Sequence, residues 1–281
     1  MLRIALGAVA AAALGFAFAG GCRAHPEPPP PAKGEASAAA LPNKFFAFCM
    51  DTHDSKKRGL AEQARLLAEL GYDGAGHLWL DQVPERLATL DAAGLALFQI
   101  YIRLDLDPAA PRPYDPRLED VLPLLRGRPT MLAGSGVRIA LYHHAGDWLA
   151  RVEDAIRVAD KVDRPDVGVM FNLCHWLRTD KSRDYAPLIA RAGKRLFAVS
   201  INGADERDPQ EGWQRYLQIL GRGSFDTRAF LAALLRSGFT GPIGLQCYGI
   251  EGDARDTLTA SMEAWRRYAA DIAAAKRAAD L

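Results

Sequence analysis

The chain has 281 residues, of which 49% are hydrophobic and 25% are charged. Lysine and arginine number 35 against 34 aspartate and glutamate residues, so the formal net charge is +1. Because nucleic-acid-binding proteins usually carry clustered positive charge, this balance disfavours nucleic acid as a partner and favours a neutral small molecule. The length suits one or two domains, and a single α/β barrel would use most of it.

Residues 1–21 have the features of a bacterial export signal. Arg3 supplies a positive charge, and residues 4–18 form an apolar segment rich in alanine and leucine. Residues 19–22 (AGGC) resemble a lipobox, in which Cys22 would be lipidated and become the mature N-terminus. We expect a lipoprotein of the bacterial cell envelope that faces the periplasm or exterior and is membrane-anchored through Cys22. A cleaved soluble signal and an uncleaved anchor are the alternatives.

The segment that follows the signal is rich in proline and alanine and lacks periodicity, which predicts a tether over residues 22–42. Three further cysteines, Cys49, Cys174 and Cys247, lie in apolar contexts where buried free thiols are common. Export permits disulfides, and Cys49 and Cys247 would lie on neighbouring strands of a closed barrel. A bridge between these two cysteines therefore stays open.

From residue 45 onward, short apolar segments alternate with amphipathic segments. The apolar segments predict strands at residues 45–50, 72–76, 95–103, 137–142, 167–171, 196–201 and 243–248. The amphipathic segments predict helices at residues 57–70, 84–93, 118–125, 151–161, 185–192, 227–237 (capped by Asp226) and 254–275. This alternation indicates a parallel sheet.

Residues 127–136 interrupt the alternation. A weak strand fits at residues 130–132, but no room is left for a helix before the strand at 137–142, and parallel crossovers need at least about ten to twelve residues. With the weak strand, the sequence predicts an α/β (β/α)8 TIM barrel over residues 43–281 that lacks one helix after the fourth strand. No G-x-G-x-x-G follows the first strand, which argues against an open dinucleotide-binding sheet.

Polar and aromatic side chains gather where the predicted strands end. Five of the six histidines lie there: His53, His77, His143, His144 and His175. The same ends carry Asp51, Trp79, Arg103, Tyr142, Asn172, Trp176, Ser200, Asn202, Gln246 and Tyr248. Because TIM barrels keep their chemistry at the C-terminal ends of the strands, these residues predict a site at the barrel mouth.

For the arginine and the two tryptophans in this set, the sequence allows two roles. Arg103 would clamp an anionic or hydroxylated substrate, or pair with Asp105 or Asp107. Trp79 and Trp176 would stack on a sugar ring, or belong to the core.

Several segments carry a family resemblance between about residues 45 and 276. They are residues 71–74 (GYDG), 137–144 (VRIALYHH), 167–175 (VGVMFNLCH), 221–225 (GRGSF) and 238–245 (GFTGPIGL). They resemble the xylose isomerase-like TIM barrels, the superfamily of sugar phosphate isomerases/epimerases and endonuclease IV. FNLCHWL and GLQCYGI resemble an exported bacterial subgroup often labelled isomerase/epimerase.

The resemblance carries an expectation about metal binding. Epimerases of this family hold a divalent metal with Glu, Asp, His and Glu at four strand ends, and the matching residues here are Tyr142, Asn172, Ser200 and Gln246. Such neutral groups are poor ligands for Mn or Zn, so we expect neither a metal nor another cofactor at the usual place. His175 matches a family histidine that is tied to substrate binding.

Two functions from different classes follow. The first is a sugar or keto-sugar isomerase/epimerase-like enzyme that transfers a proton next to a carbonyl, with His144 and His175 as acid and base and Tyr142 as a donor. The other mouth residues would then bind substrate. The second is a non-catalytic, membrane-anchored carbohydrate-binding barrel. A metal enzyme with ligands relocated to Asp51, His53, His77 and His144 also stays open, whereas DNA repair is disfavoured by the export signal and the charge.

Overall fold

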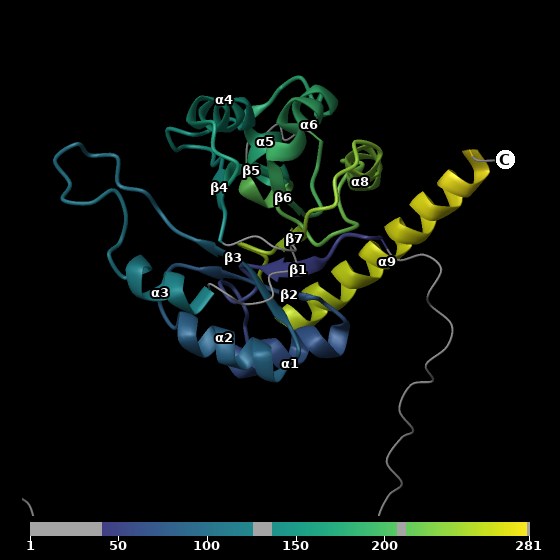
Figure 1. Ribbon diagram of the computed structural model, residues 1–281. Coiled ribbons are helices and arrows are strands. Elements are labelled where there is room, and N and C mark those ends of the chain that lie inside the picture. The colour runs from purple at the N-terminus through teal and green to yellow at the C-terminus, as the bar shows by residue number, and fades with distance from the viewer. Residues whose placement is uncertain (1–40, 126–136, 207–211, 280–281) are drawn as a thin grey trace, which may run out of the picture. The chain divides into compact units, whose positions relative to one another are not determined.

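The computed structural model describes residues 41–125, 137–206 and 212–279 (Figure 1). One curled sheet of seven parallel strands has the order β3-β2-β1-β7-β6-β5-β4. The strands are β1 (Phe45–Phe48), β2 (Gly74–Leu78), β3 (Ala96–Tyr101), β4 (Ile139–Tyr142), β5 (Val167–Asn172), β6 (Leu196–Ile201) and β7 (Ile243–Gln246). This order, with each strand followed by a helix, is that of the predicted (β/α)8 barrel, with seven of its eight predicted strands among the described residues.

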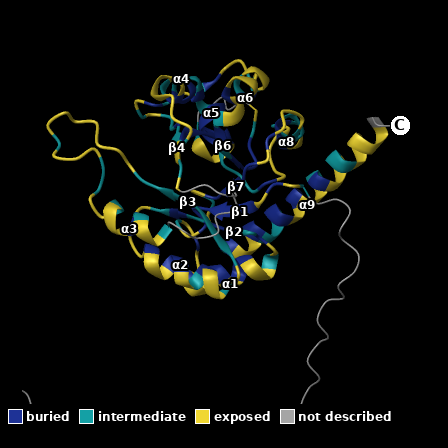
Figure 2. Cartoon of the chain, in the orientation of Figure 1, coloured by how far each residue is buried: buried dark blue, intermediate teal, exposed yellow. Residues whose placement is uncertain are grey.

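Helices cover the outer face of the sheet (Figure 1). They are α1 (Leu60–Leu70), α2 (Val83–Ala92), α3 (Leu118–Leu125), α4 (Val152–Val162), α5 (Leu173–Thr179), α6 (Ala186–Ala192), α7 (Trp213–Tyr216), α8 (Thr227–Arg236) and α9 (Ala254–Ala279), with a 3-10 turn at Gly193–Arg195. The segment between β3 and α3 is exposed along most of its length (Figure 2). Among the described residues, no helix is both long and apolar enough to cross a membrane.

Alternate residues of β1 face opposite layers, as a strand requires. Phe45 points outward and stacks on Trp265 of α9, with ring centroids 4.1 Å apart. Phe46 points inward and stacks on Phe98 of β3 at 4.8 Å. A Cβ atom at Gly244 of β7 would lie 2.7 Å from the Phe46 ring, so glycine at this position makes room for that ring.

The predicted element bounds differ from the observed ones mainly at the strand ends. β1 ends at Phe48 because Cys49 adopts a positive φ of 57°, which turns the chain out of the strand. The sequence pattern missed α5, which begins directly after β5 and is buried at Leu173 through Leu177. The predicted strand at residues 130–132 lies outside the described residues, as do the predicted signal peptide and almost all of the tether.

The three cysteines of the barrel are buried free thiols, so the possible bridge between Cys49 and Cys247 is not formed. Burial raises the pKa of the Cys247 thiol to about 12, with Asp51 adding to the shift. Burial likewise raises the pKa of the Cys174 thiol. These thiols are therefore protonated at neutral pH and act as small apolar groups.

The predicted cap at Asp226 is present, since its carboxylate accepts a hydrogen bond of 2.9 Å from the backbone N–H of Ala229 at the start of α8. We expect Asp226→Ala to lower the free energy of unfolding by about 1 kcal/mol because it leaves this N–H group without its acceptor. Urea denaturation measures the loss. Asp226→Asn keeps an acceptor oxygen and should retain most of the stability, so equal losses in the two variants would contradict the capping role.

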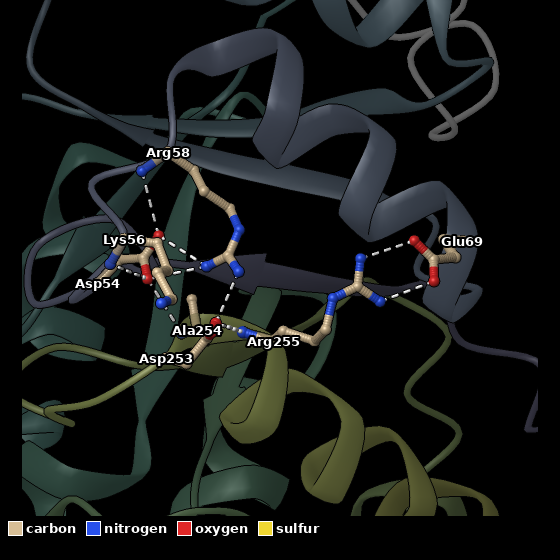
Figure 3. A network of polar contacts seen from close by, with 7 residues as sticks. All are labelled: Asp54, Lys56, Arg58, Glu69, Asp253, Ala254 and Arg255. Atoms are coloured by element: carbon tan, nitrogen blue, oxygen red, sulfur yellow. Dashed lines mark hydrogen bonds and ion pairs between the residues drawn. The ribbon is translucent and has the colours of Figure 1, made fainter.

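A buried ion pair joins the loop after β1 to the start of α9 (Figure 3). The Asp54 side chain is 2% exposed and lies 2.9 Å from the Arg58 guanidinium. Asp54 also accepts a 3.1 Å hydrogen bond from the backbone N–H of Ala254, and Arg58 reaches Asp253 at 2.7 Å. The network fixes two loops that follow neighbouring strands β1 and β7, and so it supports one side of the barrel mouth.

Candidate functional site

Tyr142 lies at the centre of the mouth, at the C-terminal end of β4. Its hydroxyl oxygen accepts hydrogen bonds from the side-chain amide groups of Asn172 at the end of β5 and Gln246 at the end of β7. The bond from Gln246 Nε2 measures 3.3 Å and joins residues 104 positions apart in the sequence. Three predicted site residues from three strands thus converge on one oxygen atom.

The side-chain amides of Asn172 and Gln246 are fixed by further hydrogen bonds. Gln246 Oε1 accepts a 3.0 Å hydrogen bond from the backbone N–H of Tyr248. Asn172 Oδ1 accepts a 3.0 Å hydrogen bond from the thiol of Cys174. The backbone N–H of Asn172 donates a hydrogen bond of 3.0 Å to His143 Nε2. His143 is fully buried and supports Asn172 from outside the mouth, so it is a structural histidine.

His144 and His175 lie against each other beside Tyr142. Their ring centroids are 4.1 Å apart, and the Tyr142 ring lies edge-on to His175 at 5.7 Å. His175 Nδ1 accepts a 3.3 Å hydrogen bond from the backbone N–H of Ala145. Burial, with His144 and His143 nearby, lowers the pKa of His175 to about 2. His175 is therefore neutral at ordinary pH, with its hydrogen on Nε2 as a donor.

His144 is the more exposed member of the pair. Its side chain is 36% exposed, and Asp147 Oδ2 lies 3.4 Å from its Nδ1. A carboxylate on this side favours a hydrogen on Nδ1 and leaves the Nε2 lone pair free. His144 therefore has the arrangement of a base, whereas His175 has that of a donor.

A chain of aromatic contacts crosses the mouth. Trp79 lies edge-on to Tyr101 at 5.3 Å, and Tyr101 lies edge-on to Tyr142 at 5.1 Å. On the other side, Trp213 lies edge-on to His175 at 5.2 Å. Trp79 and Trp213 are 42% and 39% exposed, so both ends of the chain present indole rings to a ligand. The contact between Tyr101 and Tyr142 also joins the two end strands of the sheet, β3 and β4.

Sequence reasoning missed Tyr101 and Trp213. Tyr101 carried a usable signal, because it is an aromatic residue near the C-terminal end of a predicted strand. Trp213 begins α7, which has only four residues and therefore shows no helical periodicity in the sequence.

The sequence matches the family model described as xylose isomerase-like TIM barrel over residues 108–268. The chain belongs to this family. Its fold is similar to that of a xylose isomerase domain protein from Alicyclobacillus acidocaldarius, with 17% identity and a TM-score of 0.59 over 83% of this chain and 99% of that chain. It is also similar to that of L-ribulose 3-epimerase, with 14% identity and a TM-score of 0.59 over 84% of this chain and 97% of that chain. It also resembles a xylose isomerase-like TIM barrel/4-hydroxyphenylpyruvate dioxygenase fusion protein (16%, TM-score 0.57), covering 79% of this chain and 42% of that protein. No protein with a curated description matches the sequence.

The residues predicted to replace the family's metal ligands do not fit a divalent cation. Asn172 and Gln246 direct N–H groups toward the centre, where a cation would need oxygen lone pairs. Ser200 contributes a neutral hydroxyl group. In the part of the chain that the structure describes, no three His, Cys, Asp or Glu side chains are placed to share a metal ion.

The alternative metal site at Asp51, His53, His77 and His144 is not assembled, because His77 contacts other groups. Its Nε2 donates to the carbonyl of Asp81 at 2.7 Å, and Arg86 Nε approaches its Nδ1 at 3.4 Å. Burial lowers the pKa of His77, so the ring is neutral and joins β2 to α2. This xylose isomerase-like barrel uses His77 for structure, contrary to the substrate-binding role predicted for it.

Two other predicted site residues are also structural. Trp176 is fully buried between the sheet and the helices, where it lies edge-on to Tyr185 at 5.8 Å. The sugar-stacking prediction for Trp176 is therefore wrong, and the core alternative holds. Asn202 is fully buried and donates to the backbone carbonyls of Gly203 and Tyr216 at 2.7 and 2.6 Å.

The remaining predicted residues lie at the rim. His53 Nδ1 lies 3.1 Å from the backbone nitrogen of Gly249, which donates to it, and the His53 ring lies edge-on to the half-exposed Tyr248 at 5.2 Å. Arg103 is exposed and hydrogen-bonds Tyr101, whose pKa is raised by burial and partly lowered by this arginine. Asp51 is exposed in the loop after β1.

Proposed function

We propose that the protein acts on a neutral sugar or keto-sugar as an isomerase/epimerase-like enzyme that moves a proton next to a carbonyl. The contact between His144 and His175, with Tyr142 beside them, carries this proposal because it brings a base and two donors together at the mouth. Membership of the xylose isomerase-like TIM barrel family and the similarity of the fold to that of L-ribulose 3-epimerase support the substrate class. The donor chemistry of the family's metal positions supports a reaction without a divalent metal at that place.

Each residue of this group has a distinct role in the proposed reaction. His144 removes a proton from the carbon next to the carbonyl, and the electron pair of that C–H bond moves toward the carbonyl oxygen. The N–H of His175 and the hydroxyl of Tyr142 donate hydrogen bonds to this oxygen as its negative charge grows. For isomerisation, the hydroxyl hydrogen of the carbon that lost its proton passes to the former carbonyl oxygen, and His144 returns its proton to the former carbonyl carbon. For epimerisation, the intermediate turns over in the site, and His144 returns the proton to the opposite face of the same carbon. Neither route involves net oxidation.

The exposed indoles at the rim supply a further prediction. We expect Trp79→Ala and Trp213→Ala to weaken sugar binding by about 0.5–1.5 kcal/mol each, roughly two- to tenfold, because each removes a ring that can stack on the sugar. Calorimetric titration measures the affinity. Trp148 is 59% exposed and lies outside the chain of ring contacts, so Trp148→Ala is the matched control. Equal losses in all three variants would argue against a binding site between Trp79 and Trp213.

A non-catalytic carbohydrate-binding barrel is the second candidate, and the neutral residues at all four family metal positions favour it. Chromatography of a panel of neutral ketoses after incubation with the protein separates the two candidates. Formation of an epimer or an aldose supports the enzyme. Binding without any product supports the second candidate and contradicts the first.

For localisation, we propose that Cys22 carries a lipid that anchors the barrel to the bacterial cell envelope through the proline-rich tether. Residues 19–22 (AGGC) after an apolar segment support this proposal. Labelling of the full chain with a radioactive fatty acid in a bacterial host tests it. Label should enter the wild-type chain and be lost in Cys22→Ser, and label retained in this variant would contradict the anchor.

A further inference from the structure

The centre of the mouth presents hydrogen-bond donors to the Tyr142 oxygen. The amide groups of Asn172 and Gln246 both donate to it, so both lone pairs of the phenol oxygen are occupied. The hydroxyl hydrogen is then left for a third partner. Enclosure in the mouth raises the pKa of Tyr142, so the hydroxyl keeps this hydrogen at neutral pH.

The orientation of the two amides follows from their other contacts. Rotating the Gln246 amide by half a turn would place its NH2 group against the N–H of Tyr248, which now donates to Oε1 at 3.0 Å. Rotating the Asn172 amide would remove the acceptor of the Cys174 thiol. The network therefore fixes both NH2 groups toward Tyr142.

A centre of this kind repels a cation and stabilises negative charge, because the amide dipoles of Asn172 and Gln246 point their positive ends toward it. Ser200 of β6 lies opposite Asn172 of β5 in the sheet and contributes a further polar group, its hydroxyl. Its hydroxyl is fully buried and has no hydrogen-bond partner in the described part of the chain. An unpartnered buried hydroxyl costs stability, which points to a ligand that supplies the partner.

We propose that the Tyr142 hydroxyl, supported by the amides of Asn172 and Gln246, is an oxyanion-binding donor that holds the carbonyl oxygen of the substrate where epimerases of this family hold a metal. Tyr142 touches the substrate, whereas Asn172 and Gln246 act through Tyr142 as positioning residues. The inference rests on the proposed function for the identity of the substrate. The preference of the centre for an anionic oxygen over a cation is independent of turnover.

The first experiment measures cation binding without any sugar. Electron paramagnetic resonance of Mn²⁺ mixed with the wild-type protein should show only free Mn²⁺. The double variant Asn172→Asp/Gln246→Glu replaces two inward donors with carboxylates and should gain a bound signal. Stoichiometric Mn²⁺ binding by the wild-type protein would overturn the proposal.

The second experiment compares two probes of equal chain length, gluconate and sorbitol, by calorimetric titration in the presence of a chelator. The wild-type protein should bind gluconate at least about tenfold more tightly than sorbitol, because the carboxylate can accept the Tyr142 hydroxyl. Tyr142→Phe should lose this preference while keeping its affinity for sorbitol. Equal binding of the two probes by the wild-type protein, or a preference that survives in Tyr142→Phe, would overturn the proposal.

A matched control removes a different phenol hydroxyl. Tyr72 donates a 2.8 Å hydrogen bond to the carbonyl of Leu258 in α9, so Tyr72→Phe loses a buried hydrogen bond that is not part of the Tyr142 network. This variant should keep the preference for gluconate, and its loss here would overturn the assignment to Tyr142. If the wild-type protein binds neither probe, the proposed carbohydrate function fails, and the Mn²⁺ result decides the donor centre.

Discussion

Replacing His144 with glutamine is expected to lower the turnover of a keto-sugar by about 10²–10⁴-fold, which is the range for loss of a general base. Glutamine keeps a polar side chain of similar size but cannot accept a proton. Since His144 lies at the partly exposed side of the pair and His175 stays neutral at ordinary pH, no neighbouring imidazole can take over the role. The effect should appear in kcat, with little change in the affinity for substrate.

Another histidine of the mouth serves as the control for this substitution. His53 is held by the backbone N–H of Gly249 at the rim and takes no part in the proposed reaction. His53→Gln should therefore change turnover by much less than His144→Gln. Equal rates for wild-type protein and His144→Gln would exclude His144 as the base.

Asp54→Ala is expected to lower the free energy of unfolding by about 3–5 kcal/mol, the range for breaking a buried ion pair. The substitution leaves Arg58, with a side chain only 15% exposed, without one of its two carboxylates and removes the acceptor for the N–H of Ala254 (Figure 3). Because the network joins the loops after β1 and β7, the variant should also lose rigidity at the rim. Urea denaturation at neutral pH measures the change in stability.

The exposed ion pair in the same region provides the control. Glu69 and Arg255 form two hydrogen bonds of 2.7 and 2.8 Å, but their side chains are 59% and 44% exposed. Glu69→Gln should therefore lower the stability much less than Asp54→Ala does. A loss in Asp54→Ala no larger than that in Glu69→Gln would contradict the role of the buried pair.

The contribution of Asp54 also depends on pH. Burial alone would raise its pKa, but the N–H groups of Ala254, Lys56 and Arg58 and the Arg58 guanidinium outweigh burial and lower the pKa. A lowered folded-state pKa gives stability that is fully present above the unfolded value of about 4 and is lost as pH falls through the folded value. The difference in stability between wild-type protein and Asp54→Ala should therefore shrink below about pH 4.

The fold was predictable because its signal is repeated along the chain. Buried segments such as Phe45–Phe48 are followed by amphipathic ones such as Leu60–Leu70, and repetition of this alternation along the chain indicates a parallel sheet. The helix α5 was missed because apolar residues surround it on all sides, which removes the periodicity that marks a helix.

The candidate site was predictable only as a face of the barrel. Adjacent histidines show why, since His143 turns toward Asn172 and is fully buried while His144 reaches the mouth. Beyond a strand end the two-residue alternation stops, so the sequence does not determine which way a side chain points. The same loss of register separates Trp79, which lies at the rim, from Trp176, which lies in the core.

Exchange of substrate hydrogen with solvent shows directly whether the barrel transfers a proton next to a carbonyl. The wild-type barrel is incubated with neutral ketoses in deuterated water and a chelator, and deuterium at the carbon next to the carbonyl is followed by nuclear magnetic resonance. We expect incorporation at a rate that added Mn²⁺ does not increase. Incorporation that begins only when a divalent metal is added, or no incorporation into any ketose, would contradict it.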